Sequence, residues 1–319
     1  MGPSIAMHVG IVLRMFEFKK PTIFFVTGPT AIGKTSFSLQ LAQALKTQII
    51  SCDSRQFYKE MTIGTAVPTK KQLNEIPHHF IQHKSIRDTY TPGDYQKEVL
   101  EFLEDYFQSH HVVILVGGPS LYAYGLLYGL HPFPKISPHI RFQLRHNYEQ
   151  KGIQFLQHEL RKKDLAYFQT VDQNNPRRLL RALELMEQTG CQYSQLIKKD
   201  KPSRTFESYV IQLEMSKTNL YHNINQRVNK MMQKGLLDEV KSLRTYQKKP
   251  LLNTIGYKEL FGYFDGYMTL NGAISEIKKN SRRFAKRQIT FSKKFINPWI
   301  IHPPYHLNDV LNQIQKICI

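Results

Sequence analysis

One stretch of the sequence decides the fold: Gly28-Pro29-Thr30-Ala31-Ile32-Gly33-Lys34-Thr35, or GPTAIGKT. It matches the phosphate-loop pattern GxxxxGK[ST], follows the apolar, β-rich run Thr22–Val26, and opens the stretch Thr35–Leu45, which predicts a helix. The glycines let backbone N–H groups curl around phosphate oxygens, and the N-terminus of the helix adds positive potential. We therefore expect this loop to bind a di- or triphosphate, with Lys34 as a point charge and Thr35 as a ligand of Mg²⁺.

Apolar strands and helices alternate around this loop. Ile49-Ile50 and Val112–Val116 predict further buried strands, Lys97–Phe107 predicts a helix, and strand-like sequence returns at Tyr209–Leu213. Such alternation is typical of a parallel sheet with helices on both faces. The expected fold class is therefore α/β, with a P-loop NTPase-like core.

The sequence changes character after Leu130. Residues 131–138 hold three prolines and predict a linker, whereas residues 139–200 are helical in pattern and poor in strand signals. We therefore expect the catalytic core at residues 20–134 and 204–319, and a mostly helical insertion domain at residues 135–203. Residues 1–19 are treated as an N-terminal extension.

The charge balance is strongly basic, with 44 Lys plus Arg against 25 Asp plus Glu and a net charge of +19. A field of that sign favours polyanions such as RNA, DNA or an anionic membrane surface, and composition alone does not choose among them. The three cysteines show no metal-ligand or disulfide spacing. The apolar stretch Ile5–Met15 is too short and too interrupted for a membrane span. We expect a cytoplasmic monomer without a membrane partner.

The acid nearest to the phosphate loop comes from an unusual place. An ordinary P-loop ATPase or kinase holds its metal with an aspartate at the end of a second apolar strand. Here the strand Val112–Val116 ends in Gly117-Gly118-Pro119, and the first acid at a strand end is Asp53. Asp53 could hold a metal ion through water, serve as a base, or merely cap the next turn.

Beginning at Asp53, the sequence resembles a known family. The run Asp53–Thr69 (DSRQFYKEMTIGTAVPT) is similar to the signature of tRNA dimethylallyltransferases. Further segments match in family order and span roughly residues 22–296: Gly28–Thr35, Ile76–Phe80, Val116–Tyr122, Asn175–Leu183, Gly256–Glu259 and Phe284–Gln288. Phosphate loops are common, but the DSxQ…GTAxPT run is specific to this family.

The resemblance implies a reaction. Enzymes of this family transfer a dimethylallyl group from dimethylallyl diphosphate to N6 of the adenine just 3′ of the anticodon, in tRNAs that read codons beginning with U, and release diphosphate. The expected partners are therefore the anticodon stem-loop of tRNA and dimethylallyl diphosphate, with Mg²⁺ as cofactor. The absence of a C-terminal Cys/His zinc finger indicates the bacterial type.

The resemblance also implies catalytic roles for three residues. Thr30 would hydrogen-bond the bridging oxygen of the leaving diphosphate, Asp53 would act as general base for adenine N6, and Arg227 would reach the diphosphate. Thr35 would sit on Mg²⁺. These roles fit the chemistry, because the leaving group gathers negative charge while the amine needs a carboxylate beside it.

Twelve residues would contact tRNA by the same resemblance: Asp53, Ser54, Arg55, Gln56, Pro119, Ser120, Arg141, Arg177, Arg178, Leu179, Leu180 and Arg181. The sequence departs from the family at Pro119-Ser120, where most relatives have Thr-Gly or Ser-Gly. Proline has no side-chain or backbone donor, so Ser120 is the remaining hydroxyl there. Asn223 stands where many relatives carry a second arginine.

The segment 278–294 has eight Lys/Arg and no acid. On a helix, Lys279, Arg282, Arg283 and Lys286 share one face, which suits a phosphate backbone; the alternative is a solvated charged face. We expect Arg282, Arg283 and Lys286 to bind tRNA. Another face carries four apolar residues that we expect to pack inward: Ile277, Phe284, Phe291 and Phe295.

Alternative functions remain open from the residues alone. A small-molecule P-loop kinase would explain residues 22–130, but not the insertion or the basic C-terminal helix. A prenyltransferase acting on free adenine nucleotides would need no RNA-binding lobe, and an RNA-binding module with a vestigial loop would not need Lys34, Thr35 and Asp53. His78 and His79 point to opposite faces of a strand, so we expect structural roles for both.

Overall fold

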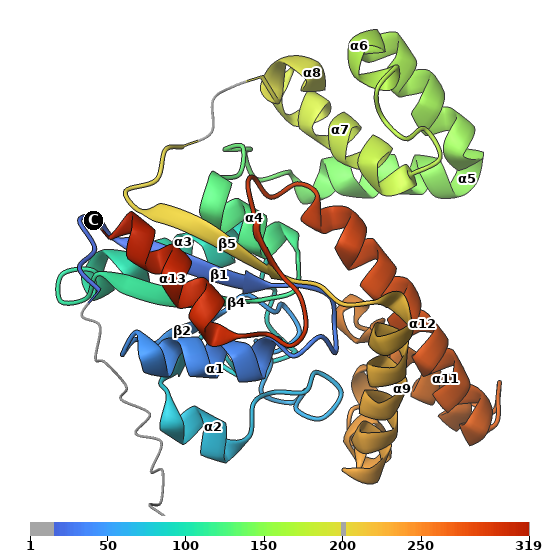
Figure 1. The fold of residues 1–319 in the computed structure, drawn as a ribbon. Coiled ribbons are helices and arrows are strands. Elements are labelled where there is room, and N and C mark those ends of the chain that lie inside the picture. The colour runs from blue at the N-terminus through green and yellow to red at the C-terminus, as the bar shows by residue number, and fades with distance from the viewer. Residues whose placement is uncertain (1–15, 199–201, 319) are drawn as a thin grey trace, which may run out of the picture. The chain divides into compact units, whose positions relative to one another are not determined.

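The computed structural model describes residues 16–198 and 202–318, so most of the extension predicted at residues 1–19 lies outside the described part. The chain forms two compact units, one running to Leu127 and resuming at Thr205–Ile319, the other comprising Tyr128–Arg204 (Figure 1). The second unit thus begins at Tyr128 rather than at residue 135. The reason lies in packing, because Phe133 and Ile136 join a small apolar cluster with Leu185 and Leu196 of that unit.

A parallel sheet of six strands forms the first unit, in the order β3-β2-β4-β1-β5-β6. The strands are β1 (Thr22–Thr27), β2 (Ile49–Ser51), β3 (His78–His79), β4 (Val112–Gly117), β5 (Glu207–Leu213) and β6 (Trp299–Ile301). Every neighbouring pair is parallel. The predicted α/β class is therefore confirmed.

Both faces of this sheet are covered, as expected for a parallel sheet of apolar strands. Phe24 and Val26 of β1 belong to a core that includes α1 (Lys34–Ala44) and α13 (Leu307–Ile317). Phe25 points the other way and lies 5.2 Å, centroid to centroid, from Phe295. The period of two along β1 therefore directs side chains into two cores, one on each side of the sheet.

The remaining helices of this unit flank the sheet or follow β5. They are α2 (Lys70–Glu75), α3 (Pro92–Tyr106), α4 (Leu121–Tyr128), α9 (Lys217–Gln233), α10 (Leu236–Ser242), α11 (Tyr257–Phe264) and α12 (Leu270–Ser292), with 3₁₀ turns at Arg244–Tyr246 and Pro250–Leu252. Helix α3 begins before the predicted Lys97 because Thr91 caps it and Asp94 completes a capping box. Gly235 follows the end of α9 in the left-handed conformation, which glycine adopts easily and which ends a helix.

The second unit is helical, with α5 (Pro138–Lys163), α6 (Leu165–Phe168), α7 (Pro176–Thr189) and α8 (Tyr193–Leu196). Helix α5 is interrupted at Gly152, whose φ of 71° is not helical. The buried Asp164 accepts hydrogen bonds from the backbone N–H groups of Tyr167 and Ser194, so its carboxylate ties α6 to α8.

The loops that matter for function follow β1, β2 and β4. Because the sheet is parallel, the carboxyl ends of these neighbouring strands open at one edge, where ligands of α/β proteins bind. The phosphate loop, Asp53 and Gly117-Gly118 all stand there. In the part of the chain that the structure describes, no helix is long and apolar enough to cross a membrane.

Candidate active site

The phosphate loop is shaped by close packing on β5. Gly28 has φ of +147°, and a Cβ at this position would approach the carbonyl oxygen of Leu213 to 2.7 Å, so only glycine fits. Helix α1 begins at Lys34, so its free N–H groups face the loop. The Lys34 ammonium donates to the carbonyl oxygens of Gly28 and Pro29, at 3.0 and 2.9 Å. The loop therefore has the curled form that phosphate binding requires.

Gln288 of α12 holds this loop from the far end of the sequence. Its Oε1 accepts a hydrogen bond from the backbone N–H of Thr30 at 2.8 Å. Its Nε2 lies against Gly118, where a Cβ would overlap it. The side chain is only 8% exposed. Gln288 thus fixes the spacing between the phosphate loop and the loop after β4.

Asp53 stands directly after β2, beside these two loops. Its Oδ1 accepts a hydrogen bond from the backbone N–H of Arg55 at 3.0 Å. Within residues 16–198 and 202–318, that N–H is the only hydrogen-bond donor to the Asp53 carboxylate, and no ion pair holds it. The carboxylate therefore caps the turn that follows β2, as one alternative expected, and no direct cationic partner among the described residues neutralises its charge.

Three charged groups influence one another here. Burial, helped by the nearby Arg227 guanidinium, lowers the pKa of Lys34 to about 8, although the Asp53 carboxylate acts in the opposite direction. Burial likewise lowers the pKa of Arg227, and the Asp53 carboxylate again favours the charged form. Lys34, Arg227 and Asp53 thus form one electrostatic cluster with two cations and one anion. Such a cluster favours a ligand of further negative charge.

Two cavities meet at this cluster. The larger has a volume of about 810 Å³ and contains the phosphate loop from Thr30 to Thr35 in its wall. The second has a volume of about 570 Å³ and is lined by Ser54, Arg55 and the loop Gly118–Ser120, among others. Six residues line both: Thr30, Asp53, Arg227, Met231, Phe284 and Gln288. A molecule in one cavity therefore faces a molecule in the other across Asp53, Thr30 and Arg227.

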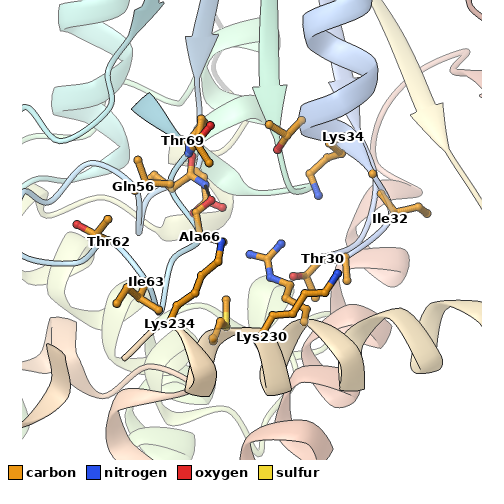
Figure 2. Close-up of a pocket in the computed structure, with 18 of the residues that line it drawn as sticks. Thr30, Ile32, Lys34, Gln56, Thr62, Ile63, Ala66, Thr69, Lys230 and Lys234 are labelled. Carbon is orange, nitrogen blue, oxygen red and sulfur yellow. Dashed lines mark hydrogen bonds between the residues drawn. The ribbon is translucent and has the colours of Figure 1, made fainter. Parts of the chain in front are cut away.

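The larger cavity also has an apolar side. Ile63, Ala66, Val67 and Leu73 line it from the segment after Asp53, and Met231 lines it from α9. Figure 2 shows Ile63 and Ala66 on the side of the cavity away from Lys34 and Ile32. The arrangement suits a ligand with an anionic head at the loop and a short apolar tail.

Glu239 of α10 shapes that apolar side. Its carboxylate accepts hydrogen bonds from three successive backbone N–H groups, those of Thr62, Ile63 and Gly64, at 3.0, 2.7 and 2.9 Å. The Tyr257 hydroxyl donates a fourth at 2.6 Å. Burial and the Glu239 charge raise the pKa of Tyr257 well above its usual value, so the hydroxyl remains a donor. A loop held by three amides on one carboxylate is fixed in position.

The residues predicted after β2 divide between the cavities. Ser54 and Arg55 line the second cavity, and Arg55 donates from Nη1 to the carbonyl of Leu251 at 3.0 Å. Gln56 lines the larger cavity instead, and its amide donates to the carbonyls of Thr65 and Ala66. Gln56 is therefore directed to the loop that Glu239 holds.

The predicted loop after β4 faces the second cavity. Pro119 is buried and Ser120 partly buried, and both line that cavity. The Ser120 Oγ accepts from the backbone N–H of Ala123 at 3.4 Å, so this hydroxyl caps α4. It retains its own hydrogen for donation. Asn223, the departure on α9, donates to the carbonyl of Ala31 at 3.4 Å and so contacts the phosphate loop.

In the helical unit, the predicted basic residues gather around α7. Arg141 and Arg181 both reach Glu184, each at 3.8 Å, and Arg177 and Arg178 are exposed at the start of the helix. Leu179 is completely buried in the core of this unit, and Leu180 packs against that core. The prediction of tRNA contact is therefore wrong for the Leu179 side chain, which the helix directs inward.

Helix α12 carries the second predicted basic surface. Arg283 and Lys286 are exposed, whereas Arg282 donates to Oδ1 of Asn225 on α9 at 2.8 Å. Ile277 and Phe295 are buried as predicted. The prediction that Phe284 packs inward is wrong, since its side chain is 39% exposed and lines both cavities. The helical spacing of apolar residues identified an apolar face of α12. It could not show that part of this face lines a cavity rather than the core.

Thr35 and Asp53 share a third, small space of about 40 Å³, together with Ser38 and Gln56. Hydroxyl, carboxylate and amide oxygens are the hard donors that Mg²⁺ prefers. No group of three His, Cys, Asp or Glu among the described residues could hold a metal by itself. His78 and His79 instead bond to the carbonyl of Ile76 and to Oε1 of Gln48, at 2.7 and 2.6 Å.

Sequence reasoning missed several residues of the site. It assigned no role to Gln288, although it stands in a family-like segment, and none to Glu239, Lys230 or Lys234. Lys230 and Lys234 follow Arg227 at helical spacing, which was the available signal. Glu239 lies 177 residues from Thr62, so no local pattern could have joined them.

Comparisons with known proteins show the family of this chain. A family model for IPP transferases matches residues 56–295. The chain is 48% identical to a tRNA dimethylallyltransferase of Christiangramia forsetii, over 84% of this chain and 89% of that protein. It is 47% identical to one of Flavobacterium johnsoniae, over 91% and 96%. Among solved structures it resembles the full-length tRNA isopentenylpyrophosphate transferase of Bacillus halodurans, with 31% identity, a TM-score of 0.68, and coverage of 94% and 97%.

Proposed function

The chain belongs to the tRNA dimethylallyltransferase family, and we propose that its two cavities divide the prenyl transfer between them. The larger cavity takes dimethylallyl diphosphate and the second takes the target adenine. The observation that carries this proposal is the shared wall: Asp53, Thr30 and Arg227 border both spaces.

The diphosphate is bound by the phosphate loop. The backbone N–H groups at the start of α1, the Lys34 ammonium and the Arg227 guanidinium supply positive charge where the leaving group gathers negative charge. Thr30 stands at the boundary between the cavities, which suits a hydrogen bond to the oxygen of the breaking C–O bond. The apolar tail then lies toward Ile63, Val67 and Met231.

The adenine enters the second cavity and presents N6 to Asp53. The exocyclic nitrogen attacks the allylic carbon, the C–O bond to diphosphate breaks, and Asp53 accepts a proton from the amine. General-base assistance of this kind contributes about 10²–10⁴ in rate. Ser54, Arg55 and Ser120 are placed to contact the base or its neighbours. The adenine must leave the loop stack first, at a cost of a few kcal/mol.

We propose that Mg²⁺ binds in the small space beside the loop, where Thr35, Ser38, Asp53 and Gln56 supply oxygen atoms. Thr35 would hold it directly and Asp53 through water, since Mg²⁺ keeps several waters and takes substrate phosphate oxygens. When bound, the ion neutralises charge on the departing diphosphate. The protein groups Lys34 and Arg227 act on the same charge.

The RNA partner is a tRNA anticodon stem-loop, and the target is the adenine just 3′ of the anticodon. Exposed Arg177 and Arg178 on the helical unit, and Arg283 and Lys286 on α12, suit contacts with phosphates. We further propose that the enzyme acts as a monomer in the cytoplasm. The rival kinase function is disfavoured because β4 ends in Gly117-Gly118 rather than in an acid.

A transfer assay tests this function. The protein is incubated with dimethylallyl diphosphate, Mg²⁺ and unmodified tRNA, and the nucleosides of the digested tRNA are analysed by mass spectrometry. We expect dimethylallyladenosine at the adenine 3′ of the anticodon. A second reaction, with AMP in place of tRNA, tests for a prenyltransferase that acts on free nucleotides. A third reaction, with ATP in place of the prenyl donor, tests for a kinase. Product in either arm but not with tRNA would overturn the proposal.

A further inference from the structure

Helix α9 and its C-cap residue Lys234 present a row of three cations to the larger cavity. Arg227, Lys230 and Lys234 follow one another at spacings of three and four residues, and all three line the cavity. With a rise of 1.5 Å per residue, the row extends over about 10 Å along the helix axis. Figure 2 shows the Lys230 and Lys234 side chains extending into the cavity, Lys230 near Thr30 and Lys234 toward Ala66.

The row runs from a protected position to an open one. Arg227 is partly buried at the boundary with the second cavity, whereas Lys230 and Lys234 are exposed and line only the larger cavity. Across the described residues, neither lysine takes part in an ion pair. Both ammonium groups therefore remain available to an incoming anion.

The charge in this cavity exceeds what the chemical step uses. Among the described residues that line it, five side chains are cationic and Asp53 is the only acid. The five cations are Lys34, Lys70, Arg227, Lys230 and Lys234. Lys34 and Arg227 already meet the diphosphate at the loop. Exposed lysines at the open side interact weakly with a bound anion. Their electrostatic field nevertheless attracts an anion toward the cavity and directs its diffusion.

We propose that Lys230 and Lys234 form an outer anion site, through which the prenyl diphosphate enters the larger cavity before it reaches Lys34 and Arg227. The inference rests on the proposed function for the identity of the donor. The diphosphate group binds first between the two exposed lysines and then moves inward along the row. Because the lysines do not line the second cavity, they act on the donor and not on the adenine.

The test compares the double variant K230Q/K234Q with K241Q/K248Q, which removes two exposed lysines from the following segment that line neither cavity. Binding of inorganic pyrophosphate with Mg²⁺ is measured by calorimetry at several KCl concentrations. We expect K230Q/K234Q to bind pyrophosphate roughly two- to thirtyfold more weakly than wild type, with a smaller dependence on salt. The control variant should match wild type.

The transfer assay supplies the second readout. We expect K230Q/K234Q to have a higher KM for dimethylallyl diphosphate than the wild type. Unchanged pyrophosphate binding in this variant would overturn the outer site. A raised KM for tRNA with an unchanged donor KM would also overturn it, since the lysines would then serve the RNA backbone. Because calorimetry needs no transfer, failure of the proposed function is seen separately, as absence of product in wild-type enzyme.

Discussion

The side-chain Oε1 of Gln288 accepts a hydrogen bond from the backbone N–H of Thr30 at 2.8 Å, although the two residues lie 258 positions apart. The same side chain packs against Gly118. One glutamine therefore sets the distance between the loop that binds the diphosphate and the loop that borders the adenine cavity. Its position at the junction of both cavities makes it a positioning residue for the reaction.

Replacing Gln288 by leucine should lower kcat/KM for both substrates. The substitution leaves the Thr30 N–H without its hydrogen-bond partner, at a cost of about 1–3 kcal/mol. We therefore expect the phosphate loop to lose its fixed position. Steady-state kinetics with dimethylallyl diphosphate and tRNA measure the effect. The exposed Thr290→Ala on the same helix serves as control. Equal kinetics for Q288L and wild type would show that the loop holds its shape without this bond.

Asp53→Asn should reduce turnover by about 10²–10⁴ while leaving tRNA affinity largely intact, because the amide cannot accept the proton from N6. Single-turnover rates measure the chemical step, and filter binding measures tRNA affinity. Asp105→Asn, at an exposed position that lines neither cavity, is the comparison variant. A D53N enzyme with the wild-type single-turnover rate would remove Asp53 from the mechanism.

The pKa of Lys34, lowered to about 8 by burial and by Arg227, predicts a pH dependence. Free enzyme loses the ammonium charge as pH rises through about 8, so kcat/KM for the donor should fall above that pH. Bound diphosphate favours the charged form, so the decline in kcat should lie at higher pH. Lys34→Arg keeps its charge, and its profile should lack the decline near pH 8. A decline at the same pH in K34R would assign it to another group.

The same shift has a consequence for stability. Between pH about 8 and the unfolded value of 10.5, the unfolded chain binds a proton at Lys34 that the folded protein does not. The contribution of this group to the free energy of unfolding therefore increases as pH rises through that window. Comparing urea denaturation of wild type and K34M across the window isolates it, since K34M should lack the increment. An identical pH dependence for both would contradict the shift.

Glu239→Gln should destabilise the loop that carries Ile63 and raise the donor KM. The carboxylate accepts from three successive amides and from Tyr257, and an amide group in its place turns a donor toward donors. We expect the free energy of unfolding to fall by about 1–3 kcal/mol. Urea denaturation and donor kinetics measure the two effects, with the exposed Glu101→Gln as control. Lost stability with an unchanged donor KM would limit Glu239 to a structural role.

Local pattern predicted the fold well. Apolar periodicity and the positions of glycine and proline predicted the phosphate loop between β1 and α1. They also predicted the strands β2, β4 and β5 and the helical insertion. The position of Asp53 also followed, because a residue just after β2 must stand at the same sheet edge as the loop after β1. Local rules suffice where neighbours in sequence are neighbours in space.

Contacts between distant segments could not be predicted in this way. The Gln288–Thr30 bond and the Glu239 contacts join residues far apart in sequence, and nothing in local period selects such partners. The burial of Leu179 and of Phe284 was predicted wrongly for the same reason, with opposite outcomes. Leu179, expected at an RNA surface, is completely buried, whereas Phe284, expected in the core, lines a cavity. Only packing distinguishes a core from a cavity wall.

The central claim is that the diphosphate and the adenine occupy separate cavities that meet at Asp53. A crystal structure of the protein with Mg²⁺, an anticodon stem-loop and a sulfur analogue of dimethylallyl diphosphate tests it most directly. We predict diphosphate density against Lys34 and the phosphate loop, with N6 of an extruded adenine within about 3 Å of the Asp53 carboxylate. An adenine bound elsewhere, or an Asp53 side chain turned away from N6, would contradict the claim.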